Sequence, residues 1–202
     1  GRHAGWITAA AGLASTNPQE GPHILMFPEV AFNKATFLAK VQSCVKEYGY
    51  CVIAASEGLS DQHGEFLAAA NSTDAFGHKQ LGGVAPILAN IVCNELKLKT
   101  HWAVADYLQR SARHIASSCD VEQSRALGQA AVTKAVADET GIMVSINRLQ
   151  NSPYKWEVGH ANLKDVANLE KKLPPEYMTA DKMHISKAAR EYLTPLIMGE
   201  AY

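Results

Sequence analysis

A run of five apolar residues, 51–55, constrains the fold of this chain more than any other stretch, because it ends directly at Ser56, Glu57 and Gly58. A short apolar run that stops at turn residues is typical of a buried strand in a parallel sheet. Ligands of open α/β sheets bind in the crevice beyond the carboxyl ends of such strands. We therefore predict that Glu57 faces a ligand, although its position alone equally allows a surface loop acid.

A second apolar run, residues 23–28, precedes the first, and helical patterns accompany both runs. Residues 4–14 are nearly all small and apolar, which favours a helix that packs closely against a sheet. Asn33 begins another helical stretch, whose apolar residues recur at helical spacing: Phe37, Leu38, Val41 and Val45. The order helix, strand, helix, strand predicts βαβ winding on a parallel sheet.

The remainder of the chain continues this alternation. We expect a helical turn at residues 65–70 and three helices at 84–96, 103–117 and 120–138. A third strand follows at 141–146, a hairpin or edge strand at 154–158, and a helical tail from 162 onward. The predicted fold class is therefore α/β, with three layers and a mostly parallel sheet flanked by helices.

The composition narrows the possible functions. With 202 residues, 47% of them hydrophobic, the chain is long enough for one α/β domain or two small lobes. Its 19 basic residues balance 20 acidic ones without a basic patch, so nothing supports nucleic-acid binding. No apolar stretch reaches the roughly 18 residues of a membrane span. The spacing of the cysteines and histidines predicts a reducing compartment and no metal site held wholly by this chain.

Two further stretches are candidates for ligand binding. Residues 76–83 contain three glycines, but they match neither the P-loop nor the Rossmann fingerprint, and a tight loop before a helix explains them equally well. Tyr107 and Arg110 are three positions apart, so on a helix they are neighbours. The spacing alone favours a solvated arginine.

Four of these stretches together resemble the phosphofructokinase family, and the resemblance extends over essentially the whole chain. Residues 1–5 are similar to the family's Met-Gly-Arg motif without its methionine, and residues 55–58 to the segment whose glutamate holds the sugar of fructose 6-phosphate. Residues 76–83 resemble the family's Leu-Gly-His-x-Gln-Arg-Gly-Gly loop, and residues 107–110 a Tyr-x-x-Arg that binds the sugar phosphate. One such motif is weak, but four in the right order are specific.

One departure indicates the branch of the family. Leu81 stands where bacterial ATP-dependent enzymes carry an arginine, and together with Tyr107 and Arg110 it is similar to the long, bacterial pyrophosphate-dependent branch. The resemblance implies transfer of a phosphoryl group from pyrophosphate to the 1-hydroxyl of fructose 6-phosphate, a step of glycolysis. The alternatives are an ATP-dependent 6-phosphofructokinase and a non-catalytic regulatory subunit that binds the sugar phosphate.

The resemblance also assigns the site, with substrate contacts at Gly1, Arg2, Glu57, His78, Tyr107 and Arg110. Arg2 is the expected catalytic residue, facing the transferred phosphoryl group. Arg110 and Tyr107 hold the 6-phosphate, which reverses the preference for a solvated arginine. Glu57 accepts hydrogen bonds from sugar hydroxyls. His78 belongs to the same pocket or organises its loop.

The family's donor segment and its catalytic aspartate segment lie upstream of the Met-Gly-Arg motif and have no match in this chain. We therefore expect the C-terminal part of a phosphofructokinase, with a fold that is incomplete without the upstream half and with Mg2+ ligands mostly upstream. Residues 1–80 and 140–175 are the expected sugar-phosphate lobe, and helices within 84–138 return toward the donor lobe. The expected partners are fructose 6-phosphate, pyrophosphate and further copies in a dimer or tetramer, in the cytoplasm, with no nucleic acid or membrane.

Overall fold

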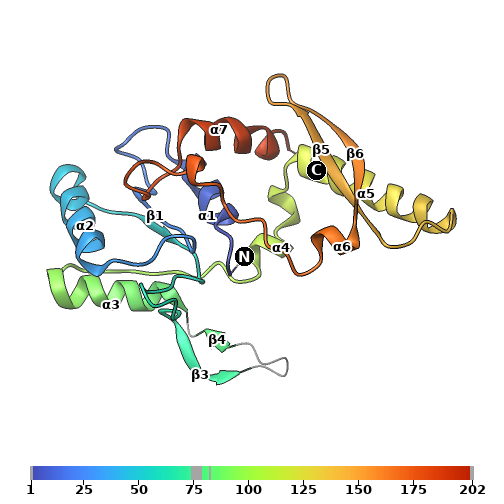
Figure 1. The fold of residues 1–202 in the computed structure, drawn as a ribbon. Helices are drawn as coiled ribbons and strands as arrows, with labels where there is room; N and C mark the ends of the chain where they lie inside the picture. The colour runs from blue at the N-terminus through green and yellow to red at the C-terminus, as the bar shows by residue number, and fades with distance from the viewer. Residues whose placement is uncertain (1, 74–78, 82, 201–202) are drawn as a thin grey trace. The chain divides into compact units, whose positions relative to one another are not determined.

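The computed structural model of the chain describes residues 2–73, 79–81 and 83–200. The chain, drawn as a ribbon in Figure 1, divides into two compact units. The first unit comprises Gly1–Ala105 and Lys171–Ala189, and the second comprises Asp106–Glu170 and Arg190–Tyr202. These boundaries differ from the lobe ranges expected above, and the assignment of a lobe to the sugar phosphate stays a prediction.

A βαβ unit forms the centre of the first unit, as the sequence predicts. Strands β1 (Ile24–Met26) and β2 (Ile53–Ala55) pair in parallel, with Met26 opposite Ala55, and α2 (Lys34–Tyr48) connects them. The helix begins where Asn33 accepts a hydrogen bond from the Thr36 N–H at 2.9 Å, and it ends at Gly49 in the left-handed conformation, with φ at 81°. The α/β class and this parallel pairing are therefore confirmed.

The core of the first unit joins β1, α2 and α3, because each presents an apolar face to the others. The side chains of β1 are buried, and α2 and α3 bury residues at helical spacing: Phe37, Val41 and Cys44 on α2, and Val84, Leu88 and Val92 on α3. The other elements that begin in this unit are α1 (Trp6–Ala11), η1 (Gly12–Ala14), β3 (Ala69–Thr73), β4 (Lys79–Leu81), α3 (Val84–Leu96), η3 (Pro175–Tyr177) and α7 (Lys187–Leu193).

Two predicted helical stretches are wrong, and the tail predicted to be helical from residue 162 onward contains, among its described residues, only short helical segments. Residues 60–68 form a loop in which the Leu67 N–H bonds to Leu59 O at 2.9 Å, and β3 follows it and pairs antiparallel with β4, so no helical turn lies there. The helix expected at 103–117 is reduced to α4 (Leu108–Ser111) and η2 (Arg113–Ile115). The backbone explains this: Asp106 has φ at 47°, and Ala112 leaves the helical region with ψ at 63°.

An antiparallel hairpin and one long helix form most of the second unit. Strands β5 (Ile142–Gln150) and β6 (Lys155–Asn162) pair with Ile146 opposite Val158, so the predicted third strand joins a hairpin and not the parallel pair. Helix α5 (Ser118–Val136) begins two residues before residue 120, where the helix was expected to start, because the Ser117 hydroxyl accepts the Asp120 N–H at 3.1 Å. The other elements are α6 (Leu163–Val166) and η4 (Thr194–Ile197).

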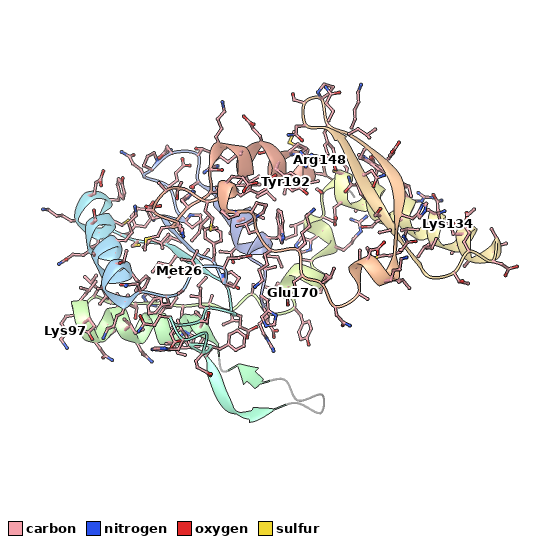
Figure 2. All side chains as sticks on the ribbon, in the orientation of Figure 1. Met26, Lys97, Lys134, Arg148, Glu170 and Tyr192 are labelled. Atoms are coloured by element: carbon pink, nitrogen blue, oxygen red, sulfur yellow. The ribbon has the colours of Figure 1, made fainter. Side chains whose placement is uncertain are left out.

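Arg148, on β5, connects the hairpin to Tyr192 in the last part of the second unit. Its guanidinium lies over the rings of Tyr154 and Tyr192, 4.7 and 4.3 Å from their centroids, and Nη1 donates to Tyr192 O at 2.6 Å. Arg148 and Tyr192 are labelled in Figure 2. Such stacking suits a planar cation. In the described part of the chain, none of the helices combines the length and apolarity needed to cross a bilayer.

Candidate functional site

The carboxyl ends of β1 and β2 carry the predicted carboxylate. The ladder continues one step beyond the strands, where the Ser56 N–H donates to Met26 O at 3.0 Å. Ser56 is buried, and its Oγ accepts the Gly58 N–H at 3.3 Å, which turns the chain tightly. This turn leaves Glu57 exposed at the end of β2. The structure therefore places Glu57 where a ligand of a parallel sheet is expected.

The segment that contains Arg2 lies directly against this turn. A Cβ atom added to Gly58 would be 1.4 Å from Arg2 O, so only a glycine allows the two backbones to approach this closely. The next residue, His3, stacks its ring on Phe66 at 5.7 Å between centroids with an interplanar angle of 4°. The structure thus brings together two predicted site residues, Arg2 and Glu57, that are 55 positions apart in the sequence.

Glu29 is a carboxylate of this region that the sequence analysis missed. Its Oε1 accepts the backbone N–H groups of Gly5 and Leu173, both at 2.8 Å. Its Oε2 is buried and has no hydrogen-bond partner among the described residues. A signal was present in the sequence, since Glu29 follows one predicted strand in the way that Glu57 follows the other.

Ser15 and His184 form a partly buried pair that looks like a nucleophile and its base, but the hydrogen bonds exclude that chemistry. His184 Nδ1 accepts the Ile185 N–H at 2.9 Å, so in the neutral ring the proton is on Nε2. Nε2 then donates to Pro22 O at 3.1 Å and faces Ser15 Oγ at 3.2 Å. A nitrogen that already carries a proton cannot take one from the serine, so the pair is structural.

Two of the remaining predicted residues, Tyr107 and Arg110, belong to the second unit. Tyr107 precedes α4 in the second unit, and its side chain is 66% exposed. Arg110 lies in α4, but its side chain is outside the described part of the chain. Gly1 and His78 also lie outside the described residues.

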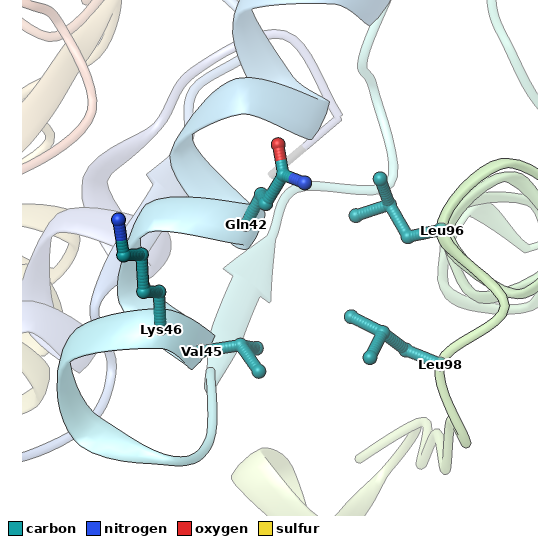
Figure 3. Close-up of a pocket in the computed structure, with 5 residues that line it drawn as sticks. All are labelled: Gln42, Val45, Lys46, Leu96 and Leu98. Atoms are coloured by element: carbon teal, nitrogen blue, oxygen red, sulfur yellow. The ribbon is translucent and has the colours of Figure 1, made fainter.

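A shallow pocket of about 280 Å³ lies between α2 and the end of α3. It is lined by the mostly apolar side chains of Gln42, Val45, Lys46, Leu96 and Leu98, with the two leucines facing α2 (Figure 3). It contains none of the predicted site residues. Within the described ranges, no three His, Cys, Asp or Glu side chains gather as ligands for a metal ion.

Comparison with known proteins identifies the class. Residues 1–135 match the family model described as Phosphofructokinase, which covers more than half of the chain. The chain belongs to the phosphofructokinase family. Over all 202 residues it is 51% identical to the pyrophosphate--fructose 6-phosphate 1-phosphotransferase of Xanthomonas campestris pv. campestris (strain B100) and covers 48% of that protein.

Solved structures agree with this assignment. The chain superposes on the pyrophosphate-dependent phosphofructokinase of Nitrosospira multiformis with a TM-score of 0.86 and 51% identity, covering 100% of this chain and 47% of the other. For the Marinobacter aquaeolei enzyme the TM-score is 0.85 at 50% identity, with the same coverage of both chains. The chain therefore has the phosphofructokinase fold predicted from the sequence, and it spans about half the length of the relatives it matches.

Proposed function

We propose that the protein carrying this chain transfers a phosphoryl group from pyrophosphate to the 1-hydroxyl of fructose 6-phosphate, giving fructose 1,6-bisphosphate. The observation that carries the proposal is the contact between Gly58 and Arg2 O, which sets Arg2 beside Glu57 at the end of a parallel strand. Pyrophosphate as the donor is supported by the names of relatives that are 50–51% identical to this chain.

The mechanism follows from what phosphoryl transfer requires. The reaction depends mainly on positioning and on neutralising charge that spreads over the equatorial oxygens. Arg2 supplies a planar cation that contacts two of these oxygens at once. Glu57 accepts hydrogen bonds from sugar hydroxyls and holds the 1-hydroxyl in line for attack.

Tyr107 and Arg110 supply the contacts to the 6-phosphate in this proposal. Arg110 binds the phosphate oxygens, and Tyr107, whose side chain is exposed, donates its hydroxyl to the same group. Gly1 and His78 complete the pocket. Residues 1–80 and 140–175 form the sugar-phosphate lobe.

Magnesium accompanies the donor in this proposal and neutralises its phosphates when bound, with ligands mostly outside this chain. The described residues offer no fitting ligand set, so no step is assigned to the ion. The protein is a cytoplasmic enzyme of glycolysis that works as a dimer or tetramer.

The test is the rate of fructose 1,6-bisphosphate formation with pyrophosphate and with ATP, in the protein that carries this chain. We expect transfer from pyrophosphate only. Glu57→Gln should raise the KM for fructose 6-phosphate at least about tenfold, because a bond to a charged acceptor is worth about 1.5–3 kcal/mol. The control is Glu47→Gln, which changes an exposed carboxylate on α2 and should leave KM unchanged. Faster transfer from ATP, or binding of the sugar phosphate without any transfer, would contradict the proposal.

A further inference from the structure

Glu29 connects three segments that are distant in the sequence. Its carboxylate lies just after β1, and its two backbone donors belong to residues 24 and 144 positions away, Gly5 and Leu173. Leu173 is buried, with 2% of its surface exposed. Bonds from N–H groups to an ionised acceptor are roughly twice as strong as neutral ones. One carboxylate oxygen therefore holds two backbones against the end of the first strand.

The other oxygen of Glu29 shows that this arrangement has an unfavourable desolvation free energy. Oε2 is buried and has no hydrogen-bond partner among the described residues. A buried acceptor without a partner is rare in folded proteins, because the energy of its lost hydration is not recovered. An apolar side chain of similar size would avoid this penalty, but it could not accept the two N–H groups. The carboxylate at position 29 is therefore explained by the two backbone N–H groups, of Gly5 and Leu173, that it accepts.

Gly5 is pressed closely onto this carboxylate. A Cβ atom on Gly5 would be 2.7 Å from Glu29 Oε2 and 3.0 Å from the ring of Phe27, so any larger residue forces either the carboxylate or the segment to shift. Gly5 also precedes α1 and accepts the Ala9 N–H at 2.8 Å, and α1 lies against β1 and β2 (Figure 1). The position of Gly5 therefore fixes the start of this helix.

Arg2 lies between two fixed points. On one side its carbonyl oxygen contacts Gly58, and on the other Gly5, three residues later, is held by Glu29. The segment therefore extends from the end of β2 to the end of β1. The Gly58 contact and the His3–Phe66 stacking lie at the Arg2 end of this segment, whereas Glu29 holds the Gly5 end through a hydrogen bond.

We propose that Glu29 is a positioning residue for Arg2, which sets the distance between the Arg2 guanidinium and the ligand held at Glu57. This inference depends on the function proposed above for Arg2. It differs from a general structural role in one respect: the catalytic effect of Glu29 acts through Arg2 and disappears when Arg2 is removed.

A double-mutant cycle on kcat and on the KM for fructose 6-phosphate, in the protein that carries this chain, tests the proposal. We expect Glu29→Ala to lower kcat at least about tenfold and to change KM less than about threefold, because a displaced guanidinium is lost mainly from the transition state. In an Arg2→Ala background, the same substitution should change kcat less than about twofold, since nothing is left to position. Equal losses in both backgrounds, or no loss in the first, would overturn the inference.

Two further variants separate positioning from folding. Glu29→Gln keeps an acceptor oxygen without the charge, so its kcat should lie between those of the unmutated protein and Glu29→Ala. If Glu29→Ala does not fold, Glu29→Gln replaces it in the double-mutant cycle. Glu20→Ala is the matched control, because Glu20 Oε2 also accepts a backbone N–H, that of Thr16 at 2.8 Å, but in an exposed loop. Its kcat should stay within about twofold.

Amide hydrogen exchange gives a readout that does not depend on activity. Exchange at Gly5 should accelerate at least about tenfold in Glu29→Ala and stay unchanged in Glu20→Ala, because only the first loses the bond to that amide. A preparation that transfers no phosphoryl group would refute the proposed function, whereas unchanged protection of Gly5 in Glu29→Ala would refute the positioning role, even in an active enzyme.

Discussion

Gly58→Ala is the substitution whose effect follows most directly from the structure. The new methyl group would be 1.4 Å from Arg2 O, whereas Cβ contacts under 3.0 Å essentially never occur, so the Arg2 backbone has to move by more than an ångström. A misplacement of about 1 Å at a catalytic group costs about 100-fold in rate. Overpacking of this kind also lowers the free energy of unfolding by about 1–3 kcal/mol. We therefore expect kcat to fall about 100-fold in a protein that still folds.

The assay combines steady-state kinetics with urea denaturation. Gly128→Ala is the matched control, because the same methyl group is added within α5 at a position with no atom within 4 Å. In a helix interior this change stabilises by up to about 1 kcal/mol, and kcat should not change. If Gly58→Ala kept both the kcat and the stability of the unmutated protein, the contact between Gly58 and Arg2 would not exist in solution, and the site would have to be rebuilt.

Three other predictions concern stability. Burial, and then the neighbouring Cys44, raise the pKa of Cys51 to about 12, above the value of about 8.5 for an unfolded thiol. The contribution of the protonated thiol to the free energy of unfolding is therefore fully present below about pH 8.5 and is lost as the pH rises toward 12. Between about pH 8 and 10, the melting temperature of Cys51→Ala should fall less than that of the unmutated protein. Arg148→Lys should lower the free energy of unfolding in urea by about 1–2 kcal/mol, because an ammonium cannot stack on two rings. Asn33→Ala should cost about 1 kcal/mol in the same assay, since α2 loses its cap; a change near zero would show that water replaces the side chain.

The elements that could be predicted are those whose signals are local. Strand β2 is an apolar run that stops at turn residues, and α2 has an apolar stripe between a capping asparagine and a glycine. The failures are equally local. Residues 103–117 have a helical pattern, but the positive φ of Asp106 interrupts it, and the apolar residues do not show that interruption. An apolar run such as 141–146 fits a parallel or an antiparallel strand, and only its pairing with β6 decides.

The site divides in the same way. The position of Glu57 at the end of β2 was predictable, because its strand, its turn and its carboxylate are consecutive in the sequence. The role of Glu29 was not predictable in this way, because both of its donors come from distant segments and backbone N–H groups carry no residue signature. The proximity of Arg2 to Glu57 likewise depends on a glycine, which the sequence presents only as a turn residue.

Glu29 and Glu57 show how one topology gives two different functions to the same chemical group. Both follow the carboxyl end of a strand in the same parallel pair, where ligands of such sheets bind. Beyond β2 the buried Ser56 turns the chain so that Glu57 is exposed, and an exposed carboxylate can exchange water for sugar hydroxyls. Beyond β1 the carboxylate is covered by Gly5 and Leu173, so its hydrogen bonds are permanent. A permanent bond cannot recognise a ligand, but it can hold the segment that does, and loss of each carboxylate should therefore appear in a different kinetic constant: KM for Glu57 and kcat for Glu29.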